Sequence, residues 1–186
     1  MHGSLAGKLL IAMPGIGDPR FEQAVILVCL HTSTQAMGLV VNKPKAELTL
    51  SDVLDHLGIE PRSDFGARSV LEGGPVKPDR GYVLHSEDFA IGDSTQEVAP
   101  GVRLTVTREV LESLASDAPP SAFVLALGYA GWGEGQLEQE LLQNVWLVAE
   151  CEREIVFDAP CDERWARAIE KLGLQPLQLS GEVGRA

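Results

Sequence analysis

A glycine-rich stretch followed by a helical pattern holds the polar residues best placed to do chemistry. Four glycines lie within eight positions, at 128, 131, 133 and 135. Because glycine costs about 0.5 to 1 kcal/mol relative to alanine inside regular structure, this density indicates special dihedrals or the close approach of another group. Gln136, Glu140 and Asn144 follow at i, i+4 and i+8 and therefore share one helical face. Their polar groups either tie down the glycine loop or line a ligand site.

The charge at the start of this helix limits the chemistry of such a ligand. Glu134 would occupy the positive end of the helix dipole, so phosphate is a poor candidate and a cation, an amide or a peptide is a better one. Trp132 lies between two of the glycines. Its ring either fills the core or presents an aromatic face to a partner.

The histidines offer weaker hypotheses of catalysis. His85 ends a strand-like segment, where a pocket rim often lies, and is a candidate general base; the alternative is a ring bonded to the backbone. Cys29 and His31 are two residues apart on one predicted strand, so we expect them to face the same side. A nucleophile and its base usually come from separate elements, however, and the apolar run 24–30 favours a core role for Cys29.

The remaining cysteines and the familiar motifs give little sign of a metal or cofactor. Cys151 and Cys161 flank a short strand-like segment, and a redox role would need their Cα atoms within about 7 Å. The chain has no CxxC pair and no zinc-ligand spacing. Residues 15–20, GIGDPR, lack the third glycine and the following helix of a dinucleotide-binding loop, which favours a plain turn. We expect neither a metal nor a cofactor.

Two kinds of loop add special geometry or local positive charge. Gly73 and Gly74 can take positive φ angles and Pro75 fixes the exit direction, which indicates a tight turn or, alternatively, an anion-accepting nest. Two basic pairs stand near prolines, Lys43 with Lys45 and Lys77 with Arg80. We interpret these pairs as solvated loops, because small charge clusters are common on surfaces.

The composition argues against several functional classes. The 27 acidic and 15 basic residues give a net charge of −12, which repels anionic membranes and argues against direct, non-specific nucleic-acid binding. The longest apolar run is seven residues, far below the roughly 20 needed to cross a bilayer. The odd, sparse cysteine count fits a reducing compartment, and the apolar patch 9–13 is too short for a secretion signal. We expect a cytoplasmic protein without membrane association.

Hydrophobic patterns predict an α+β domain. Short branched-aliphatic runs predict strands at 8–13, 25–31, 38–41, 69–72, 82–85, 102–107, 123–127, 145–149 and 154–157. Amphipathic patterns predict helices at 50–57, 108–115, 135–144 and 162–172. Several strands follow one another without a helix, which indicates a mixed and partly antiparallel sheet with flanking helices. We expect a single domain over 1–179 and a loose tail at 180–186.

Several short motifs, in their order along the chain, point to a known family. They include GLVVNKP at 38–44, GGPV at 73–76, LGYAGW at 127–132 and GQLE at 135–138. Together they resemble the YqgE/AlgH family of bacterial proteins over nearly the whole chain. The resemblance implies a cytosolic α/β domain with a bifurcated, barrel-like sheet. Some members carry a transcriptional-regulator label, and the family has no agreed catalytic residues.

We expect a regulatory or binding protein that acts through a partner protein or a small ligand. The glycine-rich segments indicate unusual backbone geometry, but no nucleophile, base and orienting group stand in a recognisable arrangement. The candidate binding positions are Asn42, Gly73, Gly74, His85, Trp132, Gln136 and Glu140. The alternative is an enzyme, a hydrolase or transferase, that uses Glu140 or His85 as general base. One concave pocket shared by Glu140, Gln136 and His85 would favour the enzyme.

Overall fold

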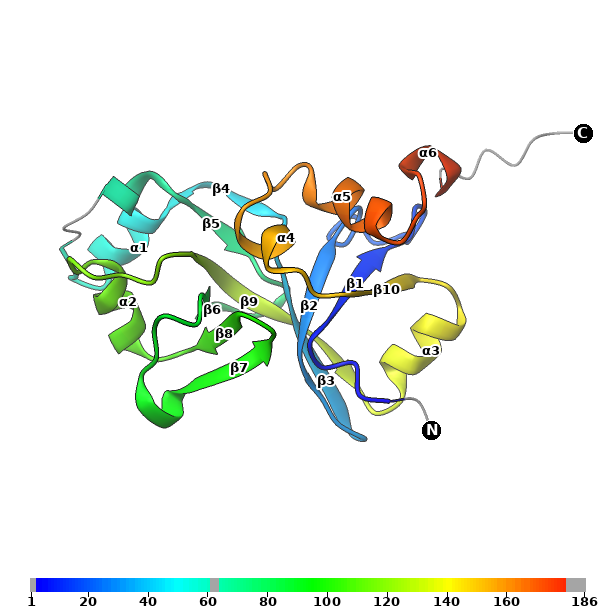
Figure 1. Cartoon of the computed structure of the whole chain (residues 1–186), viewed down its shortest axis with the longest axis horizontal. Coiled ribbons are helices and arrows are strands. Elements are labelled where there is room, and N and C mark those ends of the chain that lie inside the picture. Colours follow the sequence, from blue (N-terminus) through cyan, green and yellow to red (C-terminus); the bar gives the residue numbers. More distant parts are fainter. Residues whose placement is uncertain (1–2, 61–63, 180–186) are drawn as a thin grey trace, which may run out of the picture.

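The computed structural model describes residues 3–60 and 64–179 (Figure 1). Its strands are β1 (Lys8–Ala12), β2 (Val25–His31), β3 (Gln35–Val40), β4 (Pro44–Thr49), β5 (Ser69–Glu72), β6 (Val76–His85), β7 (Thr95–Ala99), β8 (Val102–Thr105), β9 (Phe123–Gly133) and β10 (Trp146–Glu150). Its helices are α1 (Leu50–His56), α2 (Arg108–Leu114), α3 (Gln136–Leu142), α4 (Arg153–Phe157), α5 (Arg164–Lys171) and α6 (Pro176–Leu179). Figure 1 shows α1 and α2 at one end and α3 at the other.

The strands form a ten-stranded sheet that curls into a half-barrel. Eight of them follow the order β10-β1-β2-β3-β9-β6-β8-β7, and every neighbouring pair on this path is antiparallel. Off the path, β4 pairs with β5, and β5 runs parallel to β9. The predicted α+β class, with a mixed and partly antiparallel barrel-like sheet, is confirmed.

Strand β9 connects the two ends of the molecule. Its first half pairs with β5 and β6, and its second half pairs with β3. Between the halves Gly128 takes a φ of +73°, and a Cβ atom there would lie 2.3 Å from the carbonyl oxygen of Gly74. A Cβ atom on Gly74 would lie 2.1 Å from the carbonyl carbon of Tyr129. The two segments therefore pack backbone against backbone, as only glycine permits.

Both faces of β1 and β2 are buried, which explains their continuous apolar sequences. Leu9 and Leu27 belong to one buried cluster, which α4 and α5 cover through Ile155 and Trp165. The alternate residues of these strands form a second cluster with Trp132, Leu137 and Trp146, beneath α3. A third cluster lies under α1 and α2. The second cluster supports the candidate site.

The element predictions are correct for most of the chain, but one predicted strand is a helix, and β4, β7 and α6 were not predicted. Residues 154–157, predicted as a strand, lie in helix α4, because an apolar run this short does not distinguish the two structures. Strands β4 and β7 were not predicted, since PKAELT and TQEVA are largely polar and half-exposed. The capping box of α1, between Thr49 and Asp52, is confirmed. The predicted tail 180–186 lies outside the described residues.

Candidate functional site

Helix α3 begins directly after the glycine loop. Gly135 has a φ of +69°, in the left-handed region, and turns the chain from β9 into the helix. Leu137 is buried against the sheet, so the following turn of the helix faces Trp132 and Trp146. Asn144 takes a φ of +55° and ends the helix instead of continuing its polar face.

The carboxylate of Glu140 lies between the two tryptophans. The indole Nε1 of Trp132 donates to Oε2 of Glu140 over 2.8 Å, and that of Trp146 donates to the same oxygen over 2.7 Å. Gln136 Nε2 donates to Oε1 over 3.0 Å, and Gln136 in turn accepts from the backbone N–H of Gly133. The polar stripe therefore does tie down the glycine loop, as one of the two interpretations of the sequence proposed.

The same residues line a hollow of about 450 Å³. Its opposite wall comes from the loop after β1, with Asp18, Arg20 and Phe21, and from Pro75. The ring of Phe21 meets that of Trp146 edge to face, with centroids 5.9 Å apart, and the two indoles meet at 6.2 Å. Three aromatic rings thus line the hollow, and two of them donate to the Glu140 carboxylate.

The loop wall carries an exposed ion pair. Arg20 Nη2 lies 2.7 Å from Asp18 Oδ2, and Nε bonds to the same carboxylate. The bonds from Arg20 hold the pKa of Asp18 below its ordinary value. Sequence reasoning missed Arg20, Phe21 and Trp146 as members of the site. The aromatic side chains of Phe21 and Trp146 were the only sequence feature that could have indicated a place in the site. The loop that carries Arg20 has the sequence of a plain turn.

A second, smaller hollow of about 200 Å³ adjoins the first and shares Arg20, Phe21 and Pro75 with it. Gly74 lines this second hollow together with Lys43. Gly73 does not line it: a Cβ atom there would lie 2.3 Å from the carbonyl oxygen of Gly128, so this glycine serves backbone packing. Gly73 and Gly74 do not form a hydrogen-bonded turn: the N–H of Gly73 donates to the carbonyl of Leu127 at 2.8 Å, and its carbonyl accepts from the N–H of Val40 at 2.9 Å. The N–H of Gly73 is therefore already bonded and is not available for an anion.

Asn42 is buried and holds the loop behind the hollow. Its Oδ1 accepts from the N–H of Val25 at 2.8 Å, and its Nδ2 donates to the carbonyl of Gln23 at 2.7 Å. Gln23 has a left-handed φ of +51°. Asn42 therefore fixes the path of the chain between Phe21 and β2 and contacts the site only through that loop.

His85 lies away from the hollow, inside the sheet. Its side chain is fully buried; Nδ1 donates to the carbonyl of Ser86 at 2.9 Å, and Nε2 accepts from the hydroxyl of Thr105 at 2.8 Å. Burial lowers the pKa of His85 from its ordinary value of 6.5. Gln136 and Glu140 line a common hollow, but His85 does not join them. With both ring nitrogens bonded, His85 has no nitrogen left for a substrate.

Cys29 and His31 face opposite sides of the sheet, contrary to the expectation. The register of β2 with β3 shifts between Val28 and Leu30, so Cys29 is an extra, bulged residue and alternation breaks there. Cys29 joins the first cluster, whereas His31 pairs with Ala36 of the second. The thiol–imidazole couple is therefore not formed.

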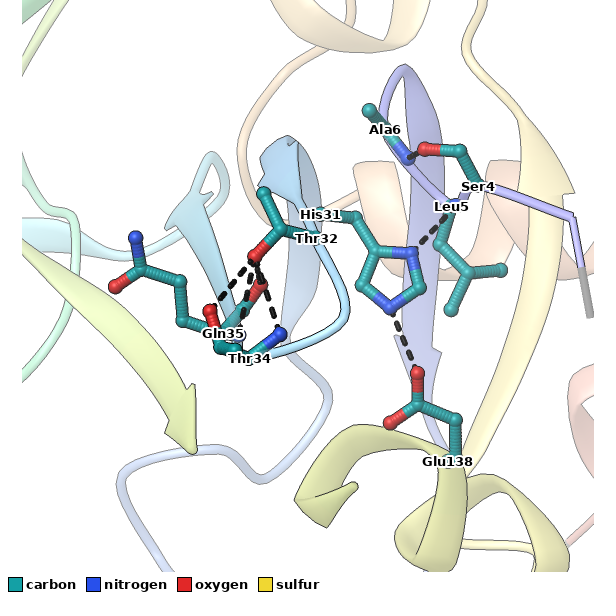
Figure 2. A network of polar contacts seen from close by, with 8 residues as sticks. All are labelled: Ser4, Leu5, Ala6, His31, Thr32, Thr34, Gln35 and Glu138. Atoms are coloured by element: carbon teal, nitrogen blue, oxygen red, sulfur yellow. Dashed lines mark hydrogen bonds and ion pairs between the residues drawn. The ribbon is translucent and has the colours of Figure 1, made fainter. Parts of the chain in front are cut away.

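The ring of His31 instead connects three segments, as Figure 2 shows. Nδ1 accepts from the N–H of Leu5 at 3.0 Å, and Nε2 donates to Oε1 of Glu138 at 2.8 Å. Nearby, the hydroxyl of Thr32 closes the β2–β3 turn by accepting from the N–H of Gln35. His31 thus anchors α3 to the sheet and to the N-terminal segment. This contact was not predicted, because Leu5 and Glu138 are far from His31 in sequence.

The cysteines do not resemble reactive thiolates. All three are free, and burial raises the pKa of Cys29 and of Cys151 to about 12 each. Cys161 is half-buried against the first cluster. Residues 3–60 and 64–179 contain no group of three or more histidine, cysteine or acidic side chains able to hold a metal. In the same residues, no helix is both long and apolar enough to span a membrane.

Comparison with known proteins decides the family. The model of the AlgH-like family matches residues 9–177. This chain belongs to the AlgH-like family. A UPF0301 protein of Caulobacter vibrioides is 49% identical over 183 residues, which cover 98% of this chain and 94% of the relative. A UPF0301 protein of Jannaschia sp. is 47% identical over 183 residues, with 98% and 95% covered. The family resemblance inferred from the short motifs is confirmed.

Solved structures of similar proteins show the same fold. The solution structure of the AlgH protein from Pseudomonas aeruginosa has a TM-score of 0.80 and 37% identity, and the match covers 100% of this chain and 98% of the other. A crystal structure of a Corynebacterium diphtheriae protein has a TM-score of 0.72 at 19% identity, with 96% and 91% covered. At 19% identity the second structure shows the shared fold alone.

Proposed function

We propose that this AlgH-like protein is a cytoplasmic regulatory protein that binds its target without chemical turnover. Its recognition site is the hollow in front of Glu140. The target is a protein segment or a small ligand with a cationic or amide N–H group. The observation that carries the proposal is the Glu140 carboxylate, which two indole N–H groups hold rigidly within an aromatic hollow of about 450 Å³.

The carboxylate has capacity for a further donor. A carboxylate oxygen accepts two hydrogen bonds. Within the described residues Oε2 accepts two bonds, from Trp132 and Trp146, whereas Oε1 accepts one, from Gln136. Because its three donors fix its position, a ligand N–H would meet an acceptor that needs no reorganisation.

The surroundings suit a segment with an apolar or planar body. Phe21 and Trp146 supply aromatic surface, and Pro75 supplies a rigid apolar edge. Clefts of a few hundred Å³ with a mainly apolar lining and a few fixed polar groups are typical of ligand sites. The absence of any bonded pair of nucleophile and base at Glu140, among the residues described, favours recognition over the alternative of a hydrolase or transferase.

The proposal is tested by comparing the wild type with Glu140→Gln and Glu150→Gln in affinity capture from the cytosol of the native organism, with native mass spectrometry of the bound material. Glu150 is an exposed carboxylate on β10, paired with Lys8 and outside the hollow, so Glu150→Gln is the matched control. We expect Glu140→Gln alone to lose the target. A target retained by Glu140→Gln, or turnover of any captured ligand, would contradict the proposal.

A further inference from the structure

A separate cleft lies at the other end of the molecule, between α1 and α2. Its volume is about 720 Å³, and it has no lining residue in common with the hollow at Glu140. The lining includes Val53 from α1, Leu57 directly after α1, and Val110 and Leu111 from α2. The strands contribute Leu48, Val83, Leu125 and Leu127. Several of these side chains are partly buried: they pack against the third buried cluster and also line the cleft.

Basic residues edge this apolar floor. Lys45, Arg80 and Arg108 line the cleft, with Asp52 and Asp79 as its acidic members. Two of these five charged side chains already bond to other protein groups. Asp52 caps α1 by accepting from Thr49, and Arg108 bonds to Glu112.

Lys45 and Arg80 have no carboxylate partner among the described residues. Lys45 is partly buried, and Arg80 is exposed with its guanidinium carbon 5.7 Å from the centroid of the Tyr82 ring. Asp79 is exposed at the same edge. An anion bound at this edge would meet the positive charges of Lys45 and Arg80 beside an apolar floor, which suits a ligand that has both a charged and an apolar part.

The backbone that carries these two cations is irregular. The register of β6 with β9 jumps between Val76 and Gly81, and Lys77 within this bulge takes a φ of +47°. In β4 the register with β5 also shifts, and Glu47 takes a φ of +58°. A left-handed residue other than glycine costs of order 1 kcal/mol or more, so such geometry persists only where its surroundings impose it. Both bulges place a basic residue on the edge of one cleft.

We propose that this cleft binds an amphipathic carboxylate, with its apolar body on the floor between α1 and α2 and its carboxylate between Lys45 and Arg80. The volume lies within the range of about 300 to 1,000 Å³ that is typical of small-molecule sites. The protein as a whole carries a charge of −12 and repels anions, so a local pair of unpaired cations is the feature that selects this ligand class. The inference does not depend on the site at Glu140.

The test is a titration of the full-length protein with decanoate at neutral pH and below its micellar concentration, followed by amide NMR spectra. Decylammonium supplies the same apolar chain with the opposite charge, and acetate supplies the carboxylate without the chain. We expect saturable decanoate binding, with shifts centred on Val53, Val106 and Leu111, which line the cleft. Decylammonium and acetate should bind at least about tenfold more weakly.

The variant Lys45→Gln/Arg80→Gln should weaken decanoate binding about tenfold. Arg153→Gln is the matched control, because Arg153 lies outside the cleft and contacts a ring, that of Phe157, at 5.8 Å. Unchanged amide spectra of the free variants show that the fold is intact. Equal affinity for decanoate and decylammonium, shifts outside the cleft, or unchanged binding in the double variant would overturn the proposal.

Discussion

The Glu140 carboxylate is the residue on which the proposed site depends. Its two indole donors belong to buried side chains, with Trp132 6% and Trp146 5% exposed, so removal of the acceptor leaves both N–H groups without a protein partner. The carboxylate therefore stabilises the second cluster and presents an acceptor to the hollow. These two roles can be separated by the choice of substitution.

Glu140→Ala should lower the free energy of unfolding by about 2 to 4 kcal/mol, because it leaves two buried N–H donors without an acceptor. Glu140→Gln keeps an oxygen at the same place and should cost less than about 1 kcal/mol. Urea unfolding monitored by tryptophan fluorescence measures both. If the two variants lost the same stability, the indole bonds would not be the cause.

The close packing of Gly74 makes a second prediction for a single residue. Gly74→Ala places a Cβ atom 2.1 Å from the backbone carbon of Tyr129, and no flexible side chain can yield there. We expect a loss of more than about 3 kcal/mol, or an unfolded product. Gly133→Ala is the control, since a Cβ atom added there would have open space within 4 Å, and it should change stability by less than about 1 kcal/mol.

Thermal unfolding of both glycine variants measures the difference. A folded Gly74→Ala protein with the melting temperature of the wild type would contradict the close backbone packing of Gly74 against β9.

At the scale of elements, sequence patterns located most strands and helices but not their pairing. Amphipathic spacing predicted α1, α2, α3 and α5 to within a few residues, because each buries one apolar face. The bulge at Cys29 could not be predicted, since it depends on how β2 pairs with β3. It reverses the side on which His31 lies and so decides that this ring anchors α3.

The candidate site was predicted in part for the same reason. Local spacing brings together the side chains of Trp132, Gln136 and Glu140. These residues are close in sequence, at the junction of β9 and α3. Arg20 and Phe21 reach the hollow through the pairing of β1 with β2, which no local pattern reveals. His85 resembled a rim residue, but β8 covers it through Thr105.

The hydrogen-bonded chain around His85 joins β6, β8 and β7 and makes stability depend on pH. The hydroxyls of Thr95 and Thr105 lie 2.8 Å apart, and Thr105 donates to the neutral ring. Burial lowers the folded-state pKa of His85 below the ordinary 6.5, so the unfolded chain binds the proton more readily. This contribution to stability is therefore complete above pH 6.5 and is lost as the pH falls from there through the folded-state pKa.

Denaturant unfolding of the wild type and of His85→Gln across this range measures the effect. The stability of the wild type should fall more steeply below pH 6.5 than that of His85→Gln, which has no titrating ring at this place. Parallel curves for the two proteins would contradict the assigned state of His85.

At the scale of the whole molecule, the long strand β9 reaches a hollow towards each end. The hollow at Glu140 lies where β9 enters α3, and the cleft between α1 and α2 contains Leu125 and Leu127 from its first half. Figure 1 shows β9 running from the end with α1 and α2 to the end with α3. The membership of the AlgH-like family fixes this architecture, whereas the charges and hollows of the chain carry the proposed binding.

The most direct test of the central claim is photo-crosslinking in the native cytosol from two positions on α3 and its end. Gln143 lines the hollow, and Gln139 is exposed on the same helix but does not line it. A photoreactive residue at 143 should capture one saturable target, and Glu140→Gln should abolish this product, while 139 captures none. Equal products from both positions, or a product at 143 that survives Glu140→Gln, would contradict recognition through the hollow.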